Sequence, residues 1–211
     1  MAAGPWSQPP GTLYTRSSVS WGEVNKDVVT RVDLHSEYGL RQGWTLTFKG
    51  EAEYRAQSDH VSGYNARLTS RHTLYQSEHI VVSLEAGLQT RTKHLWDGFC
   101  DRAEYEIRGG GAWQRSGRGR SLFVYAEAAL LYQTACQRHK VELGLNYPLS
   151  AKLSLLTQIW SERGAPYSLS DKIQTELIWH RPLLDLSLGY RAEHSGAFDE
   201  QALVFAMASR F

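Results

Sequence analysis

Hydrophobic and polar residues alternate along almost the whole chain from Thr12 onward. The alternating segments run for about ten to thirteen residues, a length that suits tilted β-strands crossing a bilayer, and helical periodicity is nearly absent. At the C-terminus one face is mainly apolar and ends on an aromatic residue: Leu203, Phe205, Met207, Ser209 and Phe211. The opposite face holds Ala202, Val204, Ala206, Ala208 and Arg210.

The same division between an apolar and a polar face recurs upstream. Apolar faces are formed by Leu184, Leu186, Leu188 and Tyr190, by Ile173, Leu177 and Trp179, by Val141, Leu143, Leu145 and Tyr147, and by Trp44, Leu46, Phe48, Ala52 and Tyr54. About twelve such segments can be counted, an even number as single-chain bacterial barrels require. We therefore predict an all-β fold, a closed antiparallel transmembrane β-barrel of about 12 strands.

The links between the segments alternate in length, as in barrels with short periplasmic turns and longer extracellular loops. Short turns are expected at 40–43, 76–79, 116–119, 148–151 and 180–183. Longer or more polar links are expected at 23–27, 57–63, 93–101, 135–139, 163–170 and 194–200. With the C-terminus in the periplasm, the longer links all lie outside the cell. The chain then divides into a periplasmic N-terminal leader, 1–11, and the barrel, 12–211.

The composition agrees with a barrel and excludes a helical membrane protein. Hydrophobic residues make up 42% of the 211 residues, the mean hydropathy is -0.43, and no apolar run reaches the roughly 18 to 20 residues of a spanning helix. Aromatic residues reach 11%, and many stand at segment ends, where interfacial girdles form. The net charge is only +1, so we expect no nucleic-acid partner.

The two ends of the chain bear on its destination. Residues 1–5 contain neither the basic nor the apolar region of an export signal, so we infer that a signal was removed from the mature protein. The terminal Phe211, with apolar residues at every second position before it, resembles the C-terminal assembly signal of bacterial outer-membrane proteins. Ser209 stands where that signal more often has Tyr or a large apolar residue. The resemblance implies the bacterial outer membrane, with its lipid and the barrel-assembly machinery as partners.

Charged residues dominate the faces assigned to the lumen. A charge facing lipid would cost about 2–4 kcal/mol near the midplane, so the interior must hold the charges. Twelve strands predict either a narrow pore or a lumen closed by ion pairs, and both readings stay open. The predicted lumen-lining residues are Arg16, Arg31, Asp33, Glu37, Lys49, Glu51, Glu53, Arg55, Arg67, Arg71, Glu85, Arg91, Glu104, Glu106, Arg108, Glu127, Glu142, Glu176, Arg191 and Glu193.

Cys100 and Cys136 are the only cysteines, and each lies in a predicted external loop. Because an exported protein meets an oxidising compartment, we favour a disulfide between them over free thiols. Its role would be to hold the external rim, with a stabilisation of a few kcal/mol. Two distant cysteines are too few for a zinc site, so we predict no metal.

In strand number, chain length and charged lumen the chain resembles the monomeric twelve-stranded sugar-acid porins, of the oligogalacturonate-specific and sialic-acid type. The resemblance implies a monomeric outer-membrane channel. Those porins favour rows of inward basic residues that attract anionic substrates, whereas this lumen mixes acids and bases. We therefore carry over the architecture and leave the solute open.

Outer-membrane hydrolases share this fold class and supply the main alternative. His60 and Ser62, with Asn65 nearby, superficially match the outer-membrane phospholipase pattern, although they fall in a polar loop. Asp59 beside His60, and His94 with Asp97, imitate the Asp/His chemistry of omptin proteases. Loop residues of these types are usually just solvated, so we assign no catalytic residue.

Two further features have structural explanations. The run 109–111, three glycines, lacks the helix and lysine of a phosphate-binding loop and more often marks a strand bend. The residues Trp21, Trp44, Trp113, Trp179 and Tyr147 are better explained as interfacial anchors than as a stacking platform.

A soluble ligand-binding barrel would have the opposite arrangement, with its apolar face inside and its polar face outside. We therefore predict a channel for small polar or charged solutes that needs no cofactor, with a structural barrel or a hydrolase as alternatives.

Overall fold

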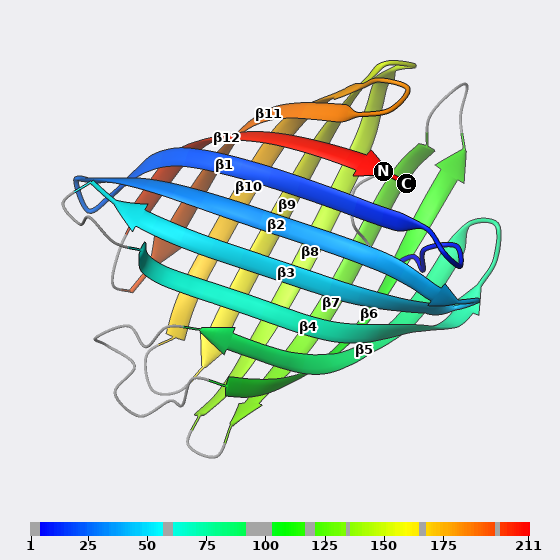
Figure 1. Ribbon diagram of the computed structural model, residues 1–211, viewed down its shortest axis with the longest axis horizontal. Coiled ribbons are helices and arrows are strands. Elements are labelled where there is room, and N and C mark those ends of the chain that lie inside the picture. The colour runs from blue at the N-terminus through cyan, green and yellow to red at the C-terminus, as the bar shows by residue number, and fades with distance from the viewer. Residues whose placement is uncertain are drawn as a thin grey trace.

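The chain folds into one closed barrel of twelve antiparallel strands (Figure 1). The computed structural model describes residues 5–56, 61–91, 103–116, 121–133, 136–164, 168–196 and 199–211. The strands are β1 (Leu13–Val24), β2 (Asp27–Arg41), β3 (Trp44–Arg55), β4 (Val61–Gln76), β5 (Ile80–Arg91), β6 (Ala103–Ser116), β7 (Ser121–Gln133), β8 (Cys136–Ser150), β9 (Leu153–Gly164), β10 (Ser168–His180), β11 (Asp185–Ser195) and β12 (Asp199–Arg210). No helix in the described part of the chain is long and apolar enough to cross a membrane. The predicted fold class and strand number are confirmed.

The first and last strands close the sheet at the two ends of the chain. β1 pairs with β12 along its whole length, and each other strand pairs with its neighbours in sequence. The Leu13 N–H donates to the Phe211 carbonyl at 2.9 Å, and the Phe211 N–H donates to the Leu13 carbonyl at 2.8 Å. Closure leaves no open sheet edge, which is what the water-free interior of a bilayer requires.

The two ends of the barrel differ. The turn end carries both chain termini and the links that follow even-numbered strands, and the loop end carries the links that follow odd-numbered strands (Figure 1). At the turn end, Gly43 in the β2–β3 link has a φ of 74°, which glycine adopts without strain. At the loop end, only Asn25 and Lys26 join β1 to β2, and both have positive φ. The expected longer link 23–27 is therefore a two-residue hairpin turn.

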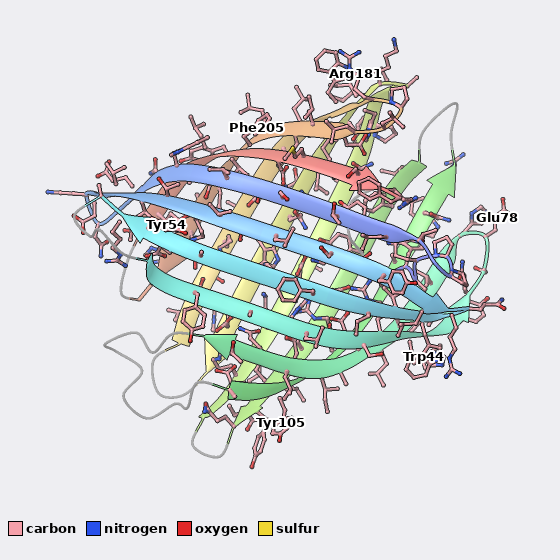
Figure 2. The ribbon with its side chains drawn as sticks, in the orientation of Figure 1. Trp44, Tyr54, Glu78, Tyr105, Arg181 and Phe205 are labelled. Atoms are coloured by element: carbon pink, nitrogen blue, oxygen red, sulfur yellow. The ribbon has the colours of Figure 1, made fainter. Side chains whose placement is uncertain are left out.

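Alternate side chains of each strand face the outside and the lumen. Leu188 and Phe205 are 62% and 44% exposed on the outer wall, whereas Glu106 and Glu176 are each 1% exposed. Figure 2 shows Trp44 near the turn end of the outer wall and Tyr54 and Tyr105 near the loop end. Aromatic side chains therefore lie at both ends of the apolar band, where interfacial girdles are expected.

Candidate functional site in the barrel lumen

The lumen contains a cavity of about 380 Å³. Its lining reaches the loop end, because Tyr64 stands near the start of β4 and Leu131 near the end of β7. Trp160 of β9 also lines the cavity, and its partners on the neighbouring strands are Glu142 and Lys172. The cavity is thus a polar, charged chamber that extends from the middle of the barrel to its loop side.

Arg71 lies at the turn side of this chamber and binds two buried acids. Its guanidinium is 3.0 Å from Glu37 and 2.8 Å from Glu85. Arg67, on the same strand, lies 3.1 Å from Glu106 and 3.6 Å from Glu85. Because these acids belong to β2, β5 and β6, the two arginines of β4 connect four strands across the lumen.

Arg108 forms a second centre of ion pairing on β6. It lies 2.7 Å from Glu127 and 3.5 Å from Glu142. The Tyr125 hydroxyl donates to Glu142 at 2.7 Å. A Cβ at Gly144 would overlap the Tyr125 ring, so a glycine at this position leaves room for the ring to lie across β8.

Arg31 and Arg191 share one buried acid at the seam of the barrel. Glu200 lies 2.9 Å from Arg31 and 2.6 Å from Arg191. Arg31 also lies 3.0 Å from Glu53 and 3.3 Å from Glu51. Removing a member of such a buried group leaves a charge without compensation, which is strongly destabilising.

Further ion pairs extend this network to the remaining strands. They join Arg16 to Glu176 at 2.7 Å, Lys172 to Glu193 at 2.7 Å, and Arg138 to both Glu104 and Glu162. We call the whole set of inward ion pairs the lumen lattice. The sequence allowed either a narrow pore or a lumen closed by ion pairs. The structure has the ion pairs, and a cavity lies among them.

Two lysines of the cavity stand outside the lattice. Neither Lys49 of β3 nor Lys140 of β8 has an ion-pair partner among the described residues, and both line the cavity. Because β3 and β8 lie far apart around the closed sheet, the two lysines approach the cavity from different sides. These are the cavity cations available to meet a solute.

The predicted lumen residues can be placed individually. Buried inside the barrel are Arg31, Glu37, Arg71, Glu85, Glu104, Glu106, Arg108, Glu127, Glu176 and Arg191. Half-buried are Arg16, Asp33, Lys49, Glu51, Glu53, Arg55, Arg67, Glu142 and Glu193, while the side chain of Arg91 lies outside the described part. The predicted set omitted five charged residues. Lys140 and Lys172 already alternate with the predicted apolar faces, and alternation extended further along β8, β9 and β12 would have found Arg138, Glu162 and Glu200.

Several other candidates lie outside the described residues. These are Cys100, Asp59, His60, His94 and Asp97, together with the side chains of Ser62 and Cys136. The disulfide and the loop hydrolase motifs therefore stay predictions. Asn65, the third member of the phospholipase-like motif, lines the lumen cavity instead of the outer wall.

The residues 5–11, called the N-terminal segment below, fold into the turn end of the barrel (Figure 1). Pro5 and Gln8 are buried there. The Gln8 backbone N–H donates to the Thr45 hydroxyl at 2.9 Å, and its side-chain amide donates to Glu37 at 2.6 Å. The segment is therefore joined to the turn side of the lumen lattice.

Trp6 connects the N-terminal segment to the opposite wall of the barrel. Its carbonyl accepts a hydrogen bond from Arg71 at 3.2 Å, and its ring meets Phe123 of β7 edge to face with centroids 5.1 Å apart. Phe123 belongs to a small buried cluster with Val81, Ala112 and Tyr125. Because its contacts run from β2 to β7, the segment lies across the turn end of the lumen.

The backbone of β2 passes very close to the N-terminal segment. The Gly11 N–H donates to the Gly39 carbonyl at 2.8 Å, and a Cβ at Gly39 would collide with the Pro9 carbonyl. Such close approach of two backbones is possible only where a side chain is missing. Gly39 is thus a point at which the sequence of β2 accommodates the leader.

Ser154, His180 and Asp185 form a hydrogen-bonded chain at the turn end that sequence reasoning missed. Ser154 Oγ lies 2.8 Å from His180 Nε2, and His180 Nδ1 lies 2.9 Å from Asp185 Oδ1. The order matches a Ser-His-Asp triad. Ser154 is 0% exposed, however, so no substrate reaches its hydroxyl in this structure. The arrangement joins β9, β10 and β11 and we assign it a structural role.

The comparisons with known proteins agree with this architecture. No protein-family model matches the chain. No curated protein matches it either. Among solved structures, the NanC porin matches with a TM-score of 0.68 at 9% identity over 92% of this chain and 98% of that chain. The KdgM porin matches with a TM-score of 0.62 at 7% identity over 93% and 99%.

An outer membrane channel from Pseudomonas putida F1 has a TM-score of 0.61 at 12% identity and covers 100% of both chains. At these identities the likeness concerns the fold. The chain therefore has the fold of the outer-membrane porins, as the sequence predicted from strand number and length. This fold and the apolar outer wall place it in the bacterial outer membrane.

Proposed function

We propose that the chain is a monomeric, narrow outer-membrane channel for small polar or charged solutes, held shut at its periplasmic end by its own N-terminal segment. The observation that carries this proposal is the polar cavity of about 380 Å³ enclosed by the barrel, with Trp6 and Gln8 across its turn side. A solute enters from the loop end and meets Lys49 and Lys140. No catalytic residue and no cofactor is needed.

The N-terminal segment can leave without dismantling the barrel. Its polar contacts with the wall are single hydrogen bonds, such as those from Gln8 to Glu37 and from Arg71 to the Trp6 carbonyl. Strand pairing begins only at Leu13, and the ion pair between Glu37 and Arg71 does not involve the segment. Opening therefore requires the loss of a few hydrogen bonds and of the packing of Pro5 and Trp6 at the turn end, while the lumen lattice stays in place.

A structural barrel is the second candidate, and the lumen lattice favours it. Arginines that are each bound to one to three glutamates attract a passing ion weakly, because their charge is already compensated. In this case the cavity would end blindly at the turn side. The two candidates differ in what happens when the N-terminal segment is removed.

Planar-bilayer recording separates them. We expect the full chain to conduct weakly and a variant lacking residues 5–10 to show larger and steadier unitary currents. The fold of the variant is checked by its circular dichroism and by the migration of the unheated barrel on a detergent gel. A folded variant that stays silent would reject the channel and favour the structural barrel.

A further inference from the structure

A groove in the outer wall spans strands β9 to β12 near the turn end. Its volume is about 460 Å³, within the roughly 300–1,000 Å³ range of small-molecule sites. Its lining is apolar and comprises Leu153, Leu177, Trp179, Leu186, Leu188 and Phe205. Figure 2 shows Phe205 on this outer surface. Because the groove opens on the lipid-facing side of the barrel, acyl chains are what it meets.

Two cations stand at the end of this groove that faces the periplasm. Lys152, in the β8–β9 turn, lines the groove. Arg181, in the β10–β11 turn, stacks over the Trp179 ring with its guanidinium carbon 4.1 Å from the ring centroid. The two turns are adjacent, since the His180 N–H donates to the Lys152 carbonyl at 2.8 Å. Figure 2 shows Arg181 projecting from the turn end of the barrel.

Within the described ranges, neither Lys152 nor Arg181 forms an ion pair with a carboxylate, unlike most lumen cations. Stacking on Trp179 fixes the Arg181 guanidinium at the interfacial aromatic level, where lipid headgroups lie. A basic pair above an apolar groove at the membrane surface has the chemistry that recognises an anionic headgroup with its acyl chains.

We propose that this groove binds one anionic phospholipid of the periplasmic leaflet. An acyl chain lies along Leu177 and Leu188, and the phosphate lies between Lys152 and Arg181. A second copy of the chain is the less suitable occupant, because a symmetric contact through this face would bring the cations of both copies together. This site is independent of the lumen and of any transport through it.

Native mass spectrometry of the full chain in nonionic detergent tests the site. The probes are dioleoylphosphatidylglycerol and dioleoylphosphatidylcholine, which differ in headgroup and share their acyl chains. We expect one phosphatidylglycerol to bind about tenfold more tightly than phosphatidylcholine, as two nearby cations would give. In the double variant Lys152→Gln and Arg181→Gln the ratio should fall to about one.

Two further variants separate the groove from general surface charge. Leu188→Trp fills the groove and keeps both cations, so binding of both lipids should fall. Arg41→Gln removes another cation of the turn end, one that lies 5.1 Å from the Trp44 ring, and should change nothing. Equal binding of the two lipids by the natural chain, an equal loss in Arg41→Gln, or a stable dimer without bound lipid would each overturn the proposal.

Discussion

The side-chain amide of Gln8 donates a hydrogen bond to Glu37 at 2.6 Å, although Gln8 precedes the first strand and Glu37 belongs to the lumen lattice. Glu37 is held at the same time by Arg71, whose guanidinium also donates to the Trp6 carbonyl. The side chains that connect the strands therefore also hold the N-terminal segment. Contacts of this kind join the N-terminal segment directly to the charged groups of the lumen.

Trp6→Ala should increase conductance in planar bilayers. The substitution removes the edge-to-face contact with Phe123, which secures the far end of the N-terminal segment. Aromatic pairs contribute about 0.5–1.5 kcal/mol beyond the area they bury, so the segment should leave the mouth more often. Trp21→Ala is the matched control, because Trp21 is 53% exposed on the outer wall. Equal currents from the natural chain and Trp6→Ala would contradict closure by this segment.

Arg108→Gln should lower the stability of the folded barrel by about 3–5 kcal/mol, because it leaves buried acids without their partner. Glu127, at 2.7 Å, is the acid most affected. The readout is the temperature at which the compact band is lost on a detergent gel. Arg163→Gln is the control, since its pair with Asp171 is exposed and should matter little. If Arg108→Gln and Arg163→Gln lose the compact band at the same temperature, the lumen lattice does not stabilise the fold.

Lys49→Gln and Lys140→Gln should shift ion selectivity towards cations. Both lysines line the cavity without an ion-pair partner in the described ranges, so their field acts directly on a permeant ion. The measurement is the reversal potential under a salt gradient, made in the variant that lacks residues 5–10. Neutralising Arg67 or Arg71, which are already paired, should shift selectivity less and cost more stability. An unchanged reversal potential in both lysine variants would remove them from the conduction path.

Ser154→Ala should weaken the barrel by about 0.5–1.5 kcal/mol, because it removes a buried hydrogen bond to His180. A catalytic role would instead appear as lost turnover of phospholipid or ester substrates with stability unchanged. We expect no such turnover in the natural chain. Hydrolysis by the natural protein that vanishes in Ser154→Ala would show that the buried hydroxyl becomes accessible.

Cys100 and Cys136 should be bonded to each other in protein prepared under oxidising conditions. The prediction rests on two cysteines in an exported protein, of which Cys136 begins β8 and Cys100 shortly precedes β6 in the sequence. Intact mass under non-reducing conditions, with and without alkylation, decides between bond and thiols. Two readily alkylated thiols in the native protein would exclude the bond.

The strands could be predicted because every second residue of a transmembrane strand faces lipid and must be apolar. A tilted strand such as β11 must alternate Leu186, Leu188 and Tyr190 with polar residues, and that pattern is visible without a structure. The rule weakens where strands extend beyond the bilayer. Arg138 and Glu200 fall in the predicted links 135–139 and 194–200, because their outward neighbours there are polar, so the sequence predicts the lattice only in part.

Other features have no periodic signal at all. The N-terminal segment forms no strand, and its position follows from contacts with residues far away in sequence, such as Phe123. The position of Trp160 also does not follow from the sequence pattern. Aromatic residues were expected at the lipid interface, yet this one faces the cavity between Glu142 and Lys172.

The reciprocal hydrogen bonds between Leu13 and Phe211 set an order of events in biogenesis. In the finished barrel the backbone of the terminal residue is fully engaged by the first strand. A receptor that binds the C-terminal segment by strand addition must therefore dissociate before β1 can pair with β12. The N-terminal segment, which lies inside the ring, has to enter before that moment or through the periplasmic opening afterwards.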